Sequence, residues 1–500
     1  MNPEYVIVQA GGKGTRLQHL TRNKPKALTP IGNRPMLFHL FEKYPNKKYI
    51  IIGDYKCDVL QRYLKAFATV DYTVVNANGV KGTCGGLRES LALIPEGSPF
   101  MLIWCDLVLP SDFCFPVQFA NYVGISKDFP CRWSWQKNTF IEQRSTEYGV
   151  AGLFLFQNTD VLQDVSEEGE FVRWLSKQSI QFEELPLWHT KEYGVLDEYN
   201  RLESGRCRPF NRLIVEGDTL IKEGIDDQGR ALAKRERTWY ASVMDKGFTN
   251  IPYIYSLNPL KMERVNGKNV FEYPLSTQEK KTILGDLVKC LRSIQTLGEM
   301  SADPQSYYDN YIGKTFERLD QVWDLIPFAR DEWITVNGKR CRNVLYHQDE
   351  LQALVAKYEP ATFRFIHGDC TFSNILLRDG KAPVIIDPRG YFGRTELYGD
   401  PAYDWAKLYY SIIGNYDQFN LKRFSLTIGE TDVQLSIESN HWEDMEQEFF
   451  RLLGDEVCPE QIKVFHAIIW LSLTTYAWED YDSICGAFYN GLRYLEEVLP

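Results

Sequence analysis

Residues 5–17 read YVIVQAGGKGTRL, an apolar run that leads directly into a glycine-rich turn. The run 5–10 is typical of a buried strand, and a helical pattern of apolar residues follows the turn. Glycines let a backbone approach a phosphate closely, while amide N–H groups and a helix N-terminus supply hydrogen-bond donors. This order of strand, glycine turn and helix therefore predicts a phosphate-binding site at one edge of an α/β sheet.

Strand and helix patterns alternate through the first 200 residues. Strands are expected at residues 5–10, 48–53, 72–76, 100–104 and 150–156, with helices at 35–43, 58–67 and 87–94. Because strands that alternate with helices build parallel sheets, we predict a Rossmann-like α/β domain over residues 1–203. The polar stretch RLESGRCR at 201–208 is expected to be a linker.

Positive charge is concentrated near the first glycine turn. The 500-residue chain has 56 Lys and Arg against 67 Asp and Glu, a net charge of −11, which disfavours general binding to nucleic acid or anionic membrane. Residues 5–41 nevertheless contain no acidic residue and six basic ones, namely Lys13, Arg16, Arg22, Lys24, Lys26 and Arg34. This segment predicts a local anion site, in which Lys24 and Lys26 add point charges to one polyphosphate.

Two further motifs follow in order. Residues 81–87, KGTCGGL, form a second glycine loop before a helical pattern, suited to close contact with a base or a second substrate. Asp106 ends the apolar run MLIWC, at the sheet edge where parallel α/β folds bind ligands. A carboxylate in that position is a natural Mg²⁺ ligand facing phosphate oxygens.

The strings GGKGTRL (11–17), KPKAL (24–28), GTCGGL (82–87) and WCDLVL (104–109) together resemble one enzyme family. They are similar to the nucleotidyltransferases with a GT-A-like fold that condense a nucleoside triphosphate with a sugar 1-phosphate or phosphocholine, releasing pyrophosphate. The resemblance covers residues 3–203. It implies that Arg16 and Lys13 hold the triphosphate, Lys26 stabilises charge at the α-phosphate and Asp106 binds Mg²⁺. It also implies nucleotide contacts from Gly11, Gly12, Lys13, Gly14, Thr15, Gly82 and Gly85.

The chain departs from this family at the second metal ligand. The family usually has a D-x-G-T/V segment, whereas residues 192–195 read EYGV. Glu192 is either the second Mg²⁺ ligand or a solvated surface glutamate, and the sequence leaves both open. Five aromatic residues could enclose a quaternary ammonium or stack on a sugar, although packing in the core is favoured. They are Trp104, Phe113, Phe115, Trp133 and Trp135.

The pattern changes after residue 208. Residues 212–216 and 219–225 read as a β-hairpin, followed by a charged helix over 230–244 and further strands over 251–262. From residue 276 onward the pattern is mainly helical. We therefore expect a bilobal α+β domain with a β-rich lobe at 204–265 and a helical lobe at 266–500.

The helical lobe contains the spacing of a phosphoryl-transfer site. Residues 365–377 read FIHGDCTFSNILL, and VIIDPRG follows at 384–390. In this arrangement Asp369 accepts the proton of the attacking hydroxyl, while Asn374 and Asp387 hold Mg²⁺ on the phosphates of ATP.

The β-rich lobe supplies the other expected parts of an ATP site. Lys222 on the second hairpin strand would grip the α- and β-phosphates, and Glu236 on the following helix would pair with it. Residues 260–263, including Met262, would form the hinge against adenine.

HGDCTFSNIL (367–376), IDPRG (386–390) and GDPAYDWAKL (399–408) resemble the aminoglycoside phosphotransferase and choline kinase family, over residues 207–500. The resemblance implies a protein-kinase-like fold. No G-x-G-x-x-G loop precedes Lys222, so residues 209–212, including Asn211, are expected to cover the phosphates. The metal-binding Asp387 is followed by Pro-Arg-Gly rather than the Trp-Glu of choline kinases, which weakens choline as the substrate.

Four residues near the loop receive expected roles. His367 is expected to support the scaffold through hydrogen bonds, and Asp400 and Asp404 to cap and brace a helix. Arg389 is a candidate contact for substrate or phosphate.

Together these patterns predict a bifunctional, Mg²⁺-dependent enzyme. A kinase that uses ATP would make a phosphomonoester, and a nucleotidyltransferase that uses a second NTP would convert it to an activated donor for surface polysaccharide synthesis. A sugar-like substrate is favoured, and choline or another amino alcohol is the alternative. In a hypothesis of another class, one half is a non-catalytic regulatory module.

The sequence also predicts the setting of the protein. It has no signal-peptide pattern and no long apolar segment, so we expect a cytoplasmic protein whose partners are nucleotides and small molecules, without nucleic acid or membrane insertion. The 11 cysteines lack C-x-x-C spacing and are expected to be buried thiols. The sequence does not indicate an oligomeric state.

Overall fold

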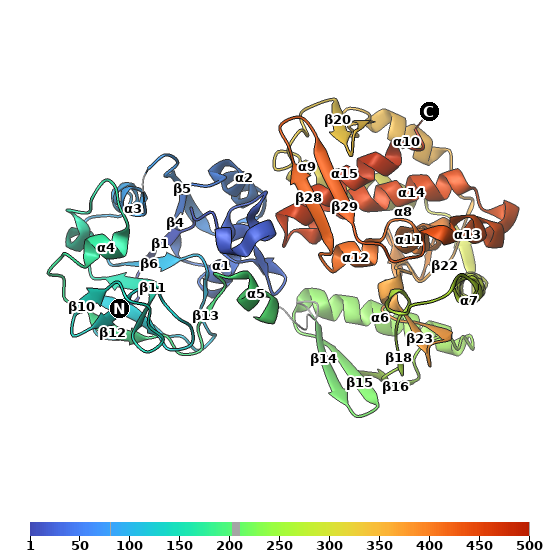
Figure 1. Ribbon diagram of the computed structural model, residues 1–500. Helices are drawn as coiled ribbons and strands as arrows, with labels where there is room; N and C mark the ends of the chain where they lie inside the picture. The colour runs from blue at the N-terminus through green and yellow to red at the C-terminus, as the bar shows by residue number, and fades with distance from the viewer. Residues whose placement is uncertain (81, 203–210, 500) are drawn as a thin grey trace. The chain divides into compact units, whose positions relative to one another are not determined.

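The computed structural model describes residues 1–80, 82–202 and 211–499 (Figure 1). The chain divides into two compact units, Met1–Arg206 with Trp478–Tyr481, and Cys207–Ala477 with Asp482–Pro500. The expected domain boundary at 203/204 lies outside the described residues. Of the ten cysteines described, eight are buried and none forms a disulfide, as the sequence predicts.

A nine-stranded mixed sheet forms the centre of the N-terminal unit. Its path runs β10-β9-β11-β6-β1-β4-β5, and β8 joins β11 to β12. The strands are β1 Tyr5–Gln9, β4 Lys48–Gly53, β5 Asp71–Asn76, β6 Phe100–Trp104, β8 Tyr122–Ser126, β9 Ser134–Gln136, β10 Thr139–Ile141, β11 Gly149–Phe156 and β12 Glu183–Pro186. Two small ribbons add β2 Pro30–Ile31 with β3 Arg34–Pro35, and β7 Leu107–Val108 with β13 Lys191–Glu192.

The expected parallel sheet is confirmed for β6, β1, β4 and β5 and is wrong for residues 150–156. Strand β11 runs antiparallel to both β6 and β8. The described segment between β6 and β11 contains short strands and no α-helix, so it lacks the crossover that parallel pairing needs.

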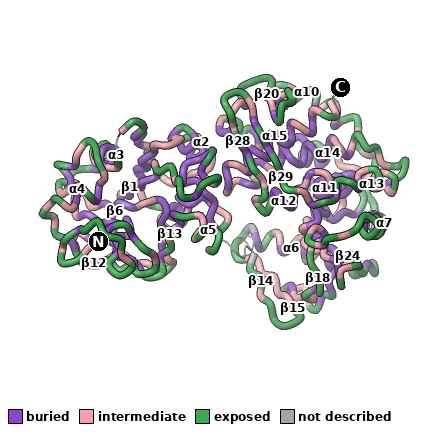
Figure 2. Tube along the Cα trace, in the orientation of Figure 1, coloured by how far each residue is buried: buried purple, intermediate pink, exposed green. Residues whose placement is uncertain are grey.

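Helices cover the central strands of this sheet. They are α1 Phe38–Lys43, α2 Cys57–Phe67, α3 Cys84–Leu91, α4 Phe171–Leu175 and α5 Leu196–Leu202. Strand β4 is buried at Tyr49, Ile50, Ile51 and Ile52 in succession, because both faces of a central parallel strand are covered. Figure 2 shows this burial along β1 and β6.

The first glycine turn does not lead into an α-helix, which corrects the sequence-based expectation. Thr15–Thr21 is a short 3₁₀ segment that begins after Gly14, at φ 61°. Gln18 at φ 52° interrupts it. A left-handed residue inside the segment prevents the helical hydrogen bonds from continuing, so the turn has no extended helix dipole behind it.

The C-terminal unit begins with the predicted hairpin. A four-stranded sheet has the order β14-β15-β17-β16. Its strands are β14 Asn211–Glu216, β15 Thr219–Gly224, β16 Ile254–Leu257 and β17 Leu260–Glu263, and helix α6 covers Asp227–Asp245. The expected hinge at residues 260–263 is wrong, since this stretch is strand β17, paired with β15 and β16. Leu260 and Met262 are buried, and their alternation with Lys261 and Glu263 is that of a strand.

The rest of the unit is mainly helical, as expected. The helices are α7 Thr277–Gln295, α8 Pro304–Tyr308, α9 Lys314–Val322, α10 Gln348–Ala356, α11 Pro401–Ile412, α12 Tyr416–Asn420, α13 Glu446–Leu453, α14 Pro459–Leu471 and α15 Tyr481–Leu495. A π-helical turn, Asp309–Gly313, joins α8 to α9.

Short strands in this helical region were missed by the sequence reading. One sheet pairs β18 Gly267–Asn269, β23 Ile375–Arg378 and β24 Ala382–Ile385, and another pairs β19 Glu299–Ser301, β22 Thr362–Phe365 and β27 Tyr398–Gly399. A third pairs β21 Lys339–Arg342, β20 Trp333–Val336, β29 Val433–Ile437 and β28 Phe424–Ile428, and a ribbon pairs β25 Tyr391–Phe392 with β26 Thr395–Glu396. The alternation in VQLSI (433–437) was a usable strand signal.

Close packing explains the second glycine loop. Gly82, at φ +92°, forms a bridge with Gly169, and a Cβ there would lie 2.3 Å from the Gly169 carbonyl oxygen. A Cβ on Gly85 would lie 2.3 Å from Val80 Cγ1. The backbone N–H groups of Thr83 and Cys84 donate to the same Gly169 carbonyl, at 2.8 and 3.0 Å. Both glycines therefore bring the start of α3 against the segment that precedes α4.

We predict that Gly82→Ala destabilises this packing more than Gly79→Ala. Gly79 has a similar φ of +89°, but a Cβ there would meet nothing within 4 Å. In both variants, strain in the backbone should lower the free energy of unfolding by roughly 1–2 kcal/mol. Only in Gly82→Ala does overpacking lower it by a further amount of about 1–3 kcal/mol. Hydrogen exchange of peptides from α3 and α4 measures the difference. Equal loss of protection in both variants would contradict the packing role.

Candidate active sites

The first candidate site lies where β6 ends in the N-terminal unit. Asp106 follows β6 by two residues, and the ribbon of β7 with β13 sets Glu192 opposite Leu107. The backbone N–H of Tyr193 donates to the Asp106 carbonyl at 3.0 Å, which fixes the ribbon beside β6. This register brings together two carboxylates that are far apart in the sequence.

Lys26 completes the carboxylate cluster. Its ammonium forms a buried ion pair with Asp106, and a hydrogen bond joins Asp106 to Glu192. Burial, followed by the charge of Asp106, raises the pKa of Glu192 to about 7. Burial alone would raise the pKa of Asp106, but Lys26 outweighs it and holds that pKa below its usual value. Asp106 is buried and Glu192 is half-buried, and two carboxylates joined in this way form a donor set that fits a divalent cation such as Mg²⁺.

Gly194 allows Glu192 to reach this position. A Cβ on Gly194 would lie 1.8 Å from Glu192 Oε1, so the side chain folds back over the glycine. Glu192 is therefore placed beside Asp106 and is not a freely solvated surface glutamate.

The first glycine turn borders the same cluster. The Lys26 N–H donates to the Gly12 carbonyl at 3.5 Å, and a Cβ on Gly14 would lie 3.1 Å from Lys26 Cβ. Gly12, Thr15 and Arg16 are exposed, and the charge of Arg16 lowers the pKa of Glu192 against the larger effect of burial.

The remaining predicted residues of this unit pack against the protein. A Cβ on Gly11 would lie 2.7 Å from Asp54 Cβ, and the Lys13 ammonium lies 5.9 Å from the ring centre of Tyr55. Trp133 belongs to the buried core, with Trp104 and Trp135 packed against it, in line with the favoured packing role.

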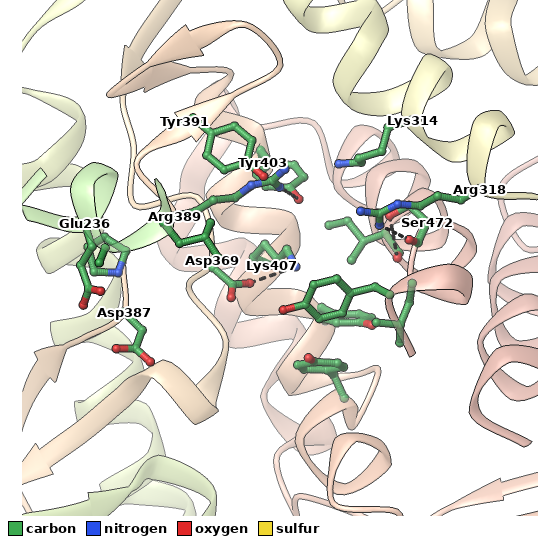
Figure 3. Close-up of a pocket in the computed structure, with 18 of the residues that line it drawn as sticks. Glu236, Lys314, Arg318, Asp369, Asp387, Arg389, Tyr391, Tyr403, Lys407 and Ser472 are labelled. Atoms are coloured by element: carbon green, nitrogen blue, oxygen red, sulfur yellow. Dashed lines mark hydrogen bonds and ion pairs between the residues drawn. The ribbon is translucent and has the colours of Figure 1, made fainter. Parts of the chain in front are cut away.

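The second candidate site is a cavity of about 290 Å³ in the C-terminal unit (Figure 3). Lys222 from β15 donates to Glu236 Oε2 and to Asp387 Oδ1, each at 2.8 Å. Burial alone would lower the pKa of Lys222, but Asp387 and Glu236 outweigh it and raise that pKa. The predicted pairing of Lys222 with Glu236 is thus present, and Asp387 joins it.

Hydrogen bonds to Asp404 support the loop that carries Asp369. The N–H groups of His367 and Gly368 donate to Asp404, at 2.9 and 2.7 Å. Burial lowers the pKa of His367 to about 4, so the ring is neutral near pH 7, and one ring nitrogen lies 3.0 Å from the Ile386 carbonyl. The structure therefore places His367 and Asp404 as supports of the loop, and Asp400 caps α11 at the Ala402 N–H.

Both oxygens of Asp369 are held by side chains. Asn374 Nδ2 donates to Oδ2 at 3.0 Å, and Lys407 Nζ lies 3.0 Å from Oδ1. The backbone N–H of Ile386 donates to the Asn374 carbonyl at 2.9 Å, which ties Asn374 to the segment that carries Asp387. Asp369 and Asp387 thus line the cavity, and Asn374 holds Asp369 from the adjoining segment.

Several lining residues were not predicted. Lys407 lies three residues after Asp404 in α11, a spacing that places both on one helix face and could have signalled it. Lys314 and Arg318 line the cavity without any motif to mark them, Tyr403 lies within the GDPAYDWAKL string, and Arg389 lines the cavity as expected. Met262 is not part of this lining, and Asn211 begins β14.

Family comparisons agree with this division of the chain. Residues 5–162 match the model of the nucleotidyl transferase family, and residues 245–424 match that of the phosphotransferase enzyme family. The chain joins a nucleotidyl transferase domain to a phosphotransferase-family domain.

Individual relatives match a limited part of the chain. The regulatory subunit alpha of mannose-1-phosphate guanylyltransferase from Dictyostelium discoideum is 35% identical over 121 residues, 22% of this chain and 28% of that protein. The UTP–glucose-1-phosphate uridylyltransferase AglF from Haloferax volcanii is 32% identical over 100 residues, 19% of this chain and 41% of that protein. The chain thus spans less than half the length of these curated relatives.

Solved structures resemble part of this chain. HddC from Yersinia pseudotuberculosis is 17% identical with a TM-score of 0.34, covering 40% of this chain and 97% of its own. The CTP:phosphocholine cytidylyltransferase LicC from Streptococcus pneumoniae is 20% identical with a TM-score of 0.34, covering 41% and 98%. Among the described residues, no helix has both the length and the apolar character needed to cross a membrane.

We predict that Lys222→Met destabilises α6 by about 3 kcal/mol, because it leaves Glu236 buried without its cation. In the double variant, Glu236→Gln removes the unpaired charge and should recover part of the lost stability. The coupling energy between the two substitutions should be about 1–3 kcal/mol. Hydrogen exchange of α6 peptides gives both values.

Lys261→Met is the matched control in the same sheet. Lys261 pairs with Glu216 at 3.1 Å, but both side chains are partly exposed, so this change should cost less than about 1 kcal/mol. If the stability changes of Lys222→Met and Glu236→Gln simply add in the double variant, the two side chains are not coupled and the buried pair is contradicted.

Proposed function

We propose that the chain is a bifunctional enzyme. The C-terminal unit phosphorylates a small hydroxylated metabolite with ATP, and the N-terminal unit transfers a nucleotidyl group from an NTP to the resulting phosphate, releasing pyrophosphate. The main support is that each unit has its own buried lysine held by a carboxylate: Lys26 with Asp106, and Lys222 with Asp387. These residues fall in segments with the sequence patterns of the two activities.

In the N-terminal unit, an oxygen of the substrate phosphate would attack the α-phosphorus of the NTP. The new O–P bond forms as the bond from the α-phosphorus to the bridging oxygen breaks, and pyrophosphate leaves. Lys26 would balance charge at the α-phosphate, and Arg16 and Lys13 would bind the triphosphate. The protein contributes position and charge, with no covalent intermediate.

In the C-terminal unit, Asp369 would accept the proton of the acceptor hydroxyl while its oxygen attacks the γ-phosphorus. The bond between the γ-phosphorus and the bridging oxygen breaks, and ADP leaves. Asn374 and Lys407 hold one oxygen of Asp369 each, so the carboxylate keeps its orientation. Lys222 is placed to bind the α- and β-phosphates.

Mg²⁺ would be held by Asp106 and Glu192 in one unit and by Asn374 and Asp387 in the other, and when bound it neutralises phosphate charge. A sugar phosphate is the favoured substrate of the transferase, because the glycine and lysine motifs are most like those of sugar-phosphate enzymes. The product would be an activated donor for surface glycan synthesis.

Two variants of the full chain test whether the activities are separate. Asp106→Asn should abolish pyrophosphate release and leave ADP formation by the kinase unchanged. Asp369→Asn should lower ADP formation by roughly 10²–10⁴-fold, the usual contribution of a general base, and leave pyrophosphate release unchanged. Loss of both activities in either variant would contradict independent sites.

A screen of acceptors and nucleotides tests the substrate class. Candidate acceptors are offered with ATP, and each phosphorylated product is then tested with CTP, GTP, UTP and dTTP. Pyrophosphate release from CTP with phosphocholine, but not with sugar phosphates, would reject the favoured substrate class.

The second carboxylate has its own test. Gly194→Ala should lower pyrophosphate release at least tenfold, because a Cβ at this position displaces the Glu192 carboxylate from Asp106. Gly285→Ala in α7 is the control, since a Cβ there would meet nothing within 4 Å and its φ is not positive. Full activity of Gly194→Ala would exclude Glu192 from the site.

A further inference from the structure

The kinase cavity has more positive than negative side chains. Five cations and three carboxylates line it, namely Lys222, Lys314, Arg318, Arg389 and Lys407 against Glu236, Asp369 and Asp387. Lys222 pairs with Glu236 and Asp387, and Lys407 pairs with Asp369. Among the described residues, no carboxylate forms an ion pair with Lys314, Arg318 or Arg389.

Neutral groups hold these three cations in place. Lys314 Nζ donates to Asn310 Oδ1 at 3.0 Å, and Arg389 Nη1 donates to the Tyr403 hydroxyl at 2.9 Å. Arg318 donates to the backbone carbonyl of Ser472. Such contacts fix the side chains without cancelling their charge. Burial and the charges of Arg389, Arg318 and Lys407 hold the pKa of Lys314 well below its usual range.

The excess charge lies at the end of the cavity away from the ATP residues. In Figure 3, Glu236 and Asp387 lie on one side of Asp369, whereas Lys314 and Arg318 lie on the other. Lys314 and Arg318 are four residues apart in α9 and therefore share one helix face. A hydroxyl brought to Asp369 would leave the rest of its molecule facing this charge.

The aromatic rings of the cavity already face cations of the protein. The Arg389 guanidinium lies 4.2 Å from the ring centre of Tyr391, and the Lys407 ammonium lies 5.4 Å from that of Tyr410. The Lys314 ammonium lies 5.8 Å from the ring centre of Tyr403. A cationic acceptor would therefore meet like charge at the rings that could otherwise attract it.

We propose that the acceptor of the kinase carries, besides its reacting hydroxyl, an anionic group that Lys314, Arg318 and Arg389 bind. The group is a carboxylate or a phosphate, whose oxygens accept from guanidinium and ammonium donors alike. The inference rests on the proposed kinase function and names its substrate class. The product is then a phosphomonoester that retains this second anionic group.

A binding measurement tests the anion site without requiring catalysis. Inorganic phosphate is titrated calorimetrically into the full chain with MgADP saturating, for the unchanged protein and for Arg318→Gln. The variant should bind phosphate at least tenfold more weakly at this site, while its MgADP affinity stays the same. Arg451→Gln, at an exposed arginine of α13 paired with Glu448, is the matched control and should change nothing. Lys314→Gln provides a second variant if Arg318→Gln does not fold.

An acceptor series then tests the substrate class. ADP formation is measured with glycerol, glycerate and glycerol 3-phosphate, with glucose, glucuronate and glucose 6-phosphate, and with choline. The anionic members should have at least 100-fold higher kcat/KM than their neutral partners, and Arg318→Gln should remove most of that advantage. The preferred member of each set distinguishes carboxylate from phosphate.

The outcomes separate the inference from the proposed function. Preference for choline or a neutral acceptor, or phosphate binding unaffected by Arg318→Gln and Lys314→Gln, would overturn the anion site while leaving the kinase intact. If phosphate binding depends on Arg318 and Lys314 but no acceptor is phosphorylated, the anion site stands and the proposed kinase activity is rejected.

Discussion

A buried charge needs an opposite charge beside it, and both sites of this protein are built around that constraint. In the C-terminal unit, Lys222 is almost fully buried and forms ion pairs with Glu236 and Asp387. These side chains come from β15, from α6 and from the loop after β24. Because removing Lys222 would leave Glu236 as an uncompensated charge in a low-dielectric interior, β15 and α6 must keep one arrangement, and Asp387 ties the loop after β24 to the same lysine.

The N-terminal unit meets the same constraint with a similar set of charges. One lysine, Lys26, faces two carboxylates, and the second of these, Glu192, has its pKa raised to about 7 by burial and by Asp106. This site therefore has room for further positive charge. The cavity of the C-terminal unit has the opposite imbalance, since among the described residues three of its cations, Lys314, Arg318 and Arg389, donate to neutral groups and form no ion pair with a carboxylate. These imbalances are the physical basis of the proposed cation site in one unit and the proposed anion site in the other.

Much of the candidate chemistry could be predicted from sequence because its residues lie close together in local motifs. Asp369 and Asn374 are five residues apart on one loop, and Lys222 lies in a hairpin signalled by EGD at 216–218. Short-range spacing could not assign Glu192, which reaches Asp106 only through the pairing of β13 with β7. It also could not predict the packing of Gly82, because Gly169, which Gly82 packs against, lies almost ninety residues further along the chain.

The sequence by itself determined the strands around the first glycine turn, the two-part organisation and the carboxylates of the phosphoryl-transfer motifs, because each is a local pattern of side chains. Only the tertiary structure decided that β11 is antiparallel, since strand direction depends on the connection and not on the strand. It also decided the charge of the kinase cavity. Lys314, Arg389 and Lys407 come from separate segments, and only folding places their charges around one cavity with Asp369.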